Sequence, residues 1–86
     1  MKSRNELAAE LKVLYKKTRP KRKATDMARV FGIVYADNIK NMGLVSPVCL
    51  DIAREANIPD TYGVEIYKGV NLSPYVMPKP DILKAF

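Results

Sequence analysis

The sequence contains no histidine and only one cysteine, Cys49. A single cysteine excludes an internal disulfide framework. Because histidine is absent, the usual general base is missing, and too few of the common ligands remain for a zinc or copper site. The chain also lacks a Walker loop, a GxGxxG motif and paired carboxylates. We therefore expect no catalytic residue, no metal and no cofactor, and a protein that is not an enzyme.

Long apolar runs are also missing. No stretch approaches the roughly 20 apolar residues that span a bilayer, and residues 1–10 lack the apolar region of a secretory signal peptide. We expect no membrane association and a cytoplasmic protein, or a nuclear one if the source is eukaryotic. The length of 86 residues and the apolar share of 48% predict a single small helical domain, residues 1–86, with its own core.

Positive charge is what the chain has in excess. It carries 15 Lys and Arg against nine Asp and Glu, a net charge of +6. Residues 1–30 contain ten basic and three acidic residues, so this third of the chain carries the whole excess. Within it, residues 16–23 (KKTRPKRK) hold six cations in eight positions. Like charges at this density repel one another, so the run must face water or an anionic partner.

Apolar residues recur at helical spacing along most of the chain, which predicts an all-α fold of three to four helices. Ser3 and Glu6 have the spacing of a capping box before the first helix. A Ser46–Pro47 pair is typical of the start of the third helix. The expected helices cover about residues 4–17, 24–42, 46–57 and 60–71.

The second expected helix is the longest and the most apolar. Gly32 in its interior indicates a close helix crossing or a kink, and Gly43 is expected to end the helix. We expect a homodimer to form along this helix, if the protein is a dimer. The core is expected to contain six nearly fully buried side chains: Leu7, Leu11, Val30, Phe31, Val34 and Ile52.

The last third of the chain is less regular. Residues 60–71 also alternate as a strand would, at Val64 and Ile66, and we favour a helix because no partner strand is evident. Residues 72–86 contain three prolines at 74, 78 and 80 and are expected to form an extended C-terminal segment. In it, Tyr75 and Val76 are expected to pack across the helices, and Asp81 to cap a last turn over residues 82–86.

The residues Ala53, Asn57 and Ile58 carry a resemblance to a known family. In the helix-turn-helix family, an alanine lies inside the first helix, a turn-forming residue follows four positions on, and an aliphatic residue comes next. The segment 52–58 resembles this helix and turn, and the resemblance implies a second helix that presents Thr61, Tyr62 and Glu65 outward to DNA. Gly63 departs from the pattern, because an aliphatic residue is usual there. A plain helical hairpin explains the same residues.

The basic run predicts binding to DNA or RNA, because Lys and Arg neutralise phosphates and release counterions. A small DNA-binding regulator or accessory factor of microbial or phage type fits this composition. Two alternatives stay open: a solvated loop between helices, and a module that docks its basic face on an acidic protein partner. The residues expected to bind nucleic acid are Lys12, Lys16, Lys17, Arg19, Lys21, Arg22, Lys23 and Arg29.

The remaining chemistry-bearing side chains are expected to be structural. Cys49 lies on the apolar face of the third expected helix, where a buried, unreactive thiol is typical. The five tyrosines are expected to belong mainly to the core, with base stacking and protein contacts as the alternatives.

Overall fold

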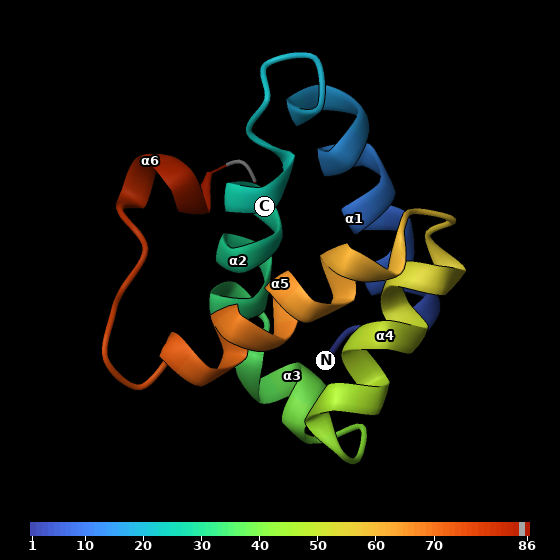
Figure 1. Ribbon diagram of the computed structural model, residues 1–86. Helices are drawn as coiled ribbons and strands as arrows, with labels where there is room; N and C mark the ends of the chain where they lie inside the picture. The colour runs from blue at the N-terminus through green and yellow to red at the C-terminus, as the bar shows by residue number, and fades with distance from the viewer. Residues whose placement is uncertain (85) are drawn as a thin grey trace.

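A computed structural model describes residues 1–84 and 86, and these residues form helices and turns without a strand. The all-α prediction is therefore confirmed (Figure 1). The helices are α1 (Arg4–Thr18), α2 (Ala24–Val34), α3 (Ala36–Lys40), α4 (Val45–Glu55), α5 (Asp60–Leu72) and α6 (Pro80–Leu83).

Helix α1 begins where the capping box places it. The Ser3 hydroxyl accepts a hydrogen bond from the Glu6 amide at 3.2 Å, and the Glu6 carboxylate accepts one from the Ser3 amide at 3.0 Å. Both bonds satisfy amides that an α-helix leaves without a partner at its start. The leucines of the apolar stripe are buried against the other helices, so this element matches its prediction.

The expectation of one helix over residues 24–42 is wrong, because the chain breaks at Tyr35 between α2 and α3. Tyr35 has φ −103° and ψ 19°, outside the helical region, and its hydroxyl donates to Glu10 on α1 at 2.7 Å. The change of direction keeps Ala36 and Ile39 in the core. The apolar stripe of α2 is buried inside the monomer, which removes the argument for α2 as a dimer seam. A homodimer stays a prediction.

Of the two alternatives for Gly32, a close helix crossing or a kink, the structure shows the crossing, between α2 and α5. A β-carbon at Gly32 would collide with the Ile66 carbonyl oxygen, and one at Gly69 would collide with the Arg29 carbonyl oxygen. Glycine thus permits the two backbones to touch. Figure 1 shows α5 crossing α2 at this point.

The same crossing decides which face of α2 is buried. Phe31 and Gly32 lie on the buried face, with Leu7, Leu11 and Ile52 from neighbouring helices also buried as expected. Val30 and Val34 are only half-buried, because they lie to one side of this stripe. The predicted core is therefore correct except for these two valines.

Helices α4 and α5 form where the sequence predicts them, with shifted starts. Helix α4 begins at Val45, one residue before the expected cap, and Pro47 falls in its first turn, where no amide partner is needed. Helix α5 begins at Asp60 itself, after Pro59, and the strand alternative for this segment is excluded. Gly43 lies between α3 and α4 with φ 137°.

The C-terminal segment is extended but does not pack as expected. Tyr75 is 83% exposed and Val76 is also exposed, because the chain arches away from the helices after α5 (Figure 1). Instead, Phe86 packs near the rings of Phe31 and Tyr35, with ring centroids 6.4 and 5.9 Å apart. The expected last turn over residues 82–86 is replaced by α6, and residue 85 lies outside the described residues.

Candidate nucleic-acid interface

The predicted basic run forms one end of the molecule, which we call the basic tip (residues 16–23). Lys16 and Lys17 belong to the last turn of α1, and residues 19–23 form the loop to α2, so the run is only partly a loop. All six of its cationic side chains are exposed. In Figure 1 the tip projects at the top of the molecule, beyond the helices.

The loop of the basic tip has a defined conformation. The Lys23 amide donates to the Thr18 carbonyl and the Arg22 amide donates to the Arg19 carbonyl, both at 3.0 Å. Arg22 has φ 57°, a left-handed conformation that is unfavourable for a side chain with a β-carbon. Four of the six cations therefore lie on a closed turn whose backbone is locally strained.

No cation of the basic tip forms an ion pair within the described part of the chain. The ion pairs of the described residues involve cations outside the tip. Examples are Lys2 with Glu10 and Arg4 with Asp51 and Glu55. Five cations of the body are thus paired with carboxylates, whereas all six cations of the tip are left without an ion pair among the described residues. An uncompensated cluster of this kind attracts a polyanion.

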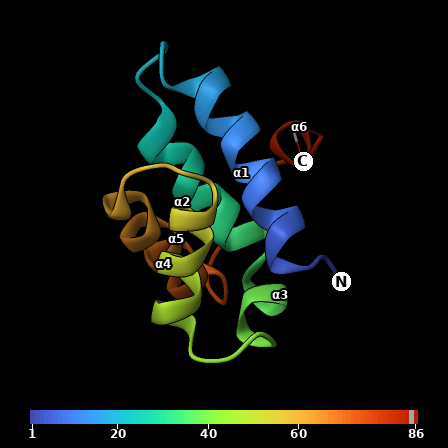
Figure 2. The same ribbon diagram turned by 90° about the vertical axis from the view of Figure 1, so that its right-hand side faces the viewer.

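Two tyrosines connect the basic tip to α5. The Arg19 guanidinium lies over the Tyr15 ring, 5.7 Å from its centroid. The Tyr15 ring in turn makes an edge-to-face contact with Tyr62 in the first turns of α5, with centroids 5.1 Å apart. In the side view of Figure 2, the tip leans toward the side of the molecule that carries α4 and α5. Arg19 of the basic tip is therefore linked to the start of α5 through the Tyr15 ring.

Helices α4 and α5 form a compact helix–turn–helix unit. Ala53, Ala56, Ile58 and Ile66 are buried between its helices and the core. Asn57 takes the left-handed conformation at φ 61°, as the resemblance implies for the turn.

Gly63, the departure from the family pattern, has a structural reason. A β-carbon there would lie 3.0 Å from the Leu50 α-carbon, so the α4 backbone occupies the space of the usual aliphatic side chain. Across the turn, Arg54 and Asp60 form an ion pair at 3.1 Å that joins the two helix ends.

The outward face of α5 differs from the one expected. Thr61 is exposed as expected, but Tyr62 is partly buried against the core, and Glu65 turns toward α2 with a side chain that is 16% exposed. Exposed residues spaced at helical intervals from Thr61 form one outward face instead: Thr61, Val64, Lys68 and Asn71. Asp60, Tyr67 and Leu72 are also exposed on this helix. Counting the helical period from the buried Ile66 would have identified Val64 and Lys68.

Two other predicted contact residues fall in different places. Lys12 lies one turn before Lys16 on the exposed side of α1, so it extends the positive surface of the basic tip. Arg29 does not extend this patch, because its Nε donates to the Glu65 carboxylate on α5. That interaction raises the pKa of Arg29 and lowers the pKa of Glu65.

The remaining expectations concern the thiol, metals and membranes. Cys49 is fully buried, as predicted, and desolvation raises its pKa to about 12. Over residues 1–84 and 86, no group of three or more His, Cys, Asp or Glu side chains is placed to hold a metal ion. Helices in the same residues are all too short or too polar to cross a bilayer.

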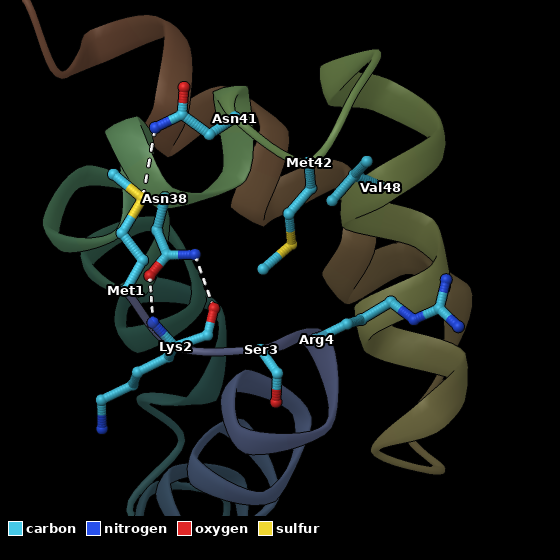
Figure 3. Close-up of a pocket in the computed structure, with 8 residues that line it drawn as sticks. All are labelled: Met1, Lys2, Ser3, Arg4, Asn38, Asn41, Met42 and Val48. Carbon is cyan, nitrogen blue, oxygen red and sulfur yellow. Dashed lines mark hydrogen bonds between the residues drawn. The ribbon is translucent and has the colours of Figure 1, made fainter.

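A hollow of about 380 Å³ lies between the N-terminal residues, α3 and α4 (Figure 3). Asn38 exchanges two hydrogen bonds with the Lys2 backbone, at 2.9 and 2.8 Å, and Arg4 is paired with Asp51 and Glu55. Its main polar groups are therefore already engaged, and the hollow is a poorer candidate for a functional site than the basic tip with α5.

Comparison with known proteins agrees with the α4–α5 geometry. A family model described as an HTH-like domain matches residues 3–79, which include the basic tip and the helix–turn–helix unit. No curated protein and no solved structure gave a match.

Proposed function

The chain belongs to the family of HTH-like domains, and on this premise we propose that it binds duplex DNA through α5 and the basic tip together. The helix–turn–helix is a fold of the DNA-binding type, in which the second helix enters the major groove. A DNA-binding regulator or accessory factor, acting in the cytoplasm or in a nucleus, is the role that suits such a domain.

One observation carries this proposal: an aromatic bridge joins the basic tip, whose cations are unpaired within the described residues, to the first turns of α5. Tyr15 provides the link, because its ring contacts both Arg19 and Tyr62. A helix placed in a major groove needs cations beside it that reach the flanking phosphates. Helix α5 itself carries only Lys68 as a cation, so the basic tip supplies the charge that α5 lacks.

The outward side chains of α5 suit contacts to base edges. Thr61 offers a hydroxyl and a methyl group, and Val64 is a 52% exposed apolar side chain. Apolar side chains and threonine methyl groups recognise the methyl group of thymine in the major groove. Since no Arg, Asn or Gln lies on the first two turns, we propose a preference for sites that place thymine opposite Thr61 and Val64.

The test is a titration of a short mixed-sequence DNA duplex across a salt series from roughly 50 to 200 mM. The wild-type protein is compared with a variant in which the six cations of the tip are changed to glutamine. We expect the wild type to bind with a steep salt dependence and the variant to lose binding. Folding should survive, because exposed, mutually repelling side chains contribute little packing.

A matched control changes exposed cations that lie outside the tip and form no ion pair within residues 1–84 and 86: Lys40, Lys79 and Lys84. This variant should bind nearly as the wild type does, apart from a small long-range effect of charge. Absence of wild-type binding to any polyanion at roughly 50 mM salt, where phosphate contacts are strongest, would refute the proposal and favour an acidic protein partner.

A further inference from the structure

A second hollow gathers polar donors from α2 and α5. It has a volume of about 360 Å³ and is lined by Arg29, Lys68, Asn71 and Leu72. Two cations, one amide and one apolar side chain therefore surround a single open space. The sequence gives no direct sign of this grouping, because Arg29 and Lys68 lie 39 positions apart and meet only through the α2–α5 crossing.

A shared carboxylate holds the two cations at this hollow. Glu65 pairs with the Arg29 Nε and, at 3.4 Å, with the Lys68 Nζ. The Glu65 side chain is 16% exposed, whereas Arg29 is 42% and Lys68 is 53% exposed. The carboxylate thus lies beneath the cations, and the cations face the solvent.

Both cations keep donors for a ligand. Arg29 uses its Nε for Glu65, and the structure shows no hydrogen bond from its two Nη groups to any described residue. Lys68 has three donors and uses one of them. Arg29 and Lys68 carry two positive charges against the Glu65 carboxylate, and Asp26 lies close enough to Arg29 to offset part of this charge. The donors that remain suit a singly charged phosphodiester.

We propose that Arg29, Lys68 and Asn71 form a clamp for one phosphate of the DNA backbone, with Leu72 against the adjoining sugar. The clamp rests on the proposed DNA binding and adds a second anchor to it. From Thr61 to Asn71, α5 rises over ten residues, roughly 15 Å, and the major groove is roughly 12 Å wide. Because Lys68 and Asn71 belong to the last turns of α5, the clamp holds the DNA backbone at the C-terminal end of this helix, whereas Thr61 lies in its first turn.

The test uses the duplex titration with single variants of the clamp. Each lost phosphate contact lowers the slope of log K against log salt by about 0.9. We expect Lys68→Gln to lower the slope by about this amount and to weaken binding to all sequences alike, whereas Lys68→Arg should keep the slope. Asn71→Ala should weaken binding with little change in slope, because an amide carries no charge.

The matched control is Lys40→Gln, which removes an exposed cation of α3, and it should leave the slope nearly unchanged. Thermal unfolding of each variant shows that the fold is intact. If the wild type binds and Lys68→Gln has the wild-type slope, the clamp is refuted while the proposed function stands. If the wild type binds no duplex at roughly 50 mM salt, the proposed function fails and the clamp fails with it.

Discussion

Within residues 1–84 and 86, two connections place a residue other than glycine in the left-handed conformation, Arg22 between α1 and α2 and Asn57 between α4 and α5. Asparagine adopts this conformation readily, whereas arginine does so at a cost of roughly 1–2 kcal/mol. The α4–α5 turn is also flanked by the buried Ala56 and Ile58, and the α1–α2 loop is exposed throughout.

The α4–α5 turn and the α1–α2 loop also differ in whether their charges are paired. Arg54 and Asp60 compensate each other across the α4–α5 turn, while the basic tip keeps six uncompensated cations. The α4–α5 turn therefore fixes the angle between its two helices. The α1–α2 loop keeps a left-handed Arg22 and a high density of positive charge, both of which lower stability. Such exceptions are typical of functional sites.

The largest expected effect concerns the fixed position of α5. Gly32→Ala or Gly69→Ala should destabilise the fold by about 3 kcal/mol or more, because the added β-carbon meets a backbone carbonyl that cannot rotate away. Chemical denaturation measures the change. Gly63→Ala is the graded control, since its β-carbon would approach Leu50 less closely and should cost less.

If Gly32→Ala and Gly63→Ala proved equally mild, the α2–α5 crossing would be more adaptable than this account allows. Helix α5 would then not be held in place by close backbone contact, and the contrast with the exposed basic tip would lose its structural basis.

The next effect tests the contrast between the two turns themselves. Arg22→Gly should stabilise the protein by about 0.5–1 kcal/mol, because relief of the left-handed strain exceeds the entropy that glycine loses on folding. Asn57→Ala should destabilise it by about 1 kcal/mol. For a domain of this size, each kcal/mol shifts the melting temperature by roughly 4–8 °C. If both substitutions changed the melting temperature in the same direction, the two turns would not differ in backbone strain.

The smallest effect concerns pH. Arg29 holds the pKa of Glu65 below its ordinary value of 4.5, so the unfolded chain binds the proton more tightly than the folded one. This contribution is present at neutral pH and is lost as pH falls through the lowered pKa, below 4.5. Glu65→Gln should cost less than about 1 kcal/mol at pH 7 and flatten the acid side of the stability curve.

The control for this effect is Asp81→Asn, an exposed carboxylate on α6 outside the ion pairs of the described residues. It should leave the acid side of the curve unchanged. An acid limb in Glu65→Gln as steep as in the wild type would show that this carboxylate does not couple α2 to α5.

The sequence predicts local features of this fold well, because helical periodicity, the Ser3–Glu6 capping box and the turn residue Asn57 act over a few neighbouring positions. Several tertiary features were missed. At the break, Tyr35 forms a hydrogen bond to Glu10, 25 positions away, a contact that no local pattern predicts. The exposure of Tyr75 depends on the path of the chain after α5, which no local pattern specifies.

The candidate interface also combines features that local sequence predicts with features that depend on tertiary packing. Charge density alone located the basic tip, since its cations are adjacent in sequence. The face of α5 was misassigned at Tyr62 and Glu65, because their burial depends on Tyr15 and Arg29 from other helices. The sequence resemblance indicated the correct helices, and only packing showed which of their side chains point outward.

The most direct test of the central claim, that the basic tip and α5 form one interface, is NMR mapping of backbone amides during titration with a DNA duplex. The account predicts saturable shifts over residues 16–23 and in the first two turns of α5, at Thr61 and Val64, with Lys40 on α3 unaffected. Shifts confined to the basic tip, with α5 unchanged at saturation, would contradict it.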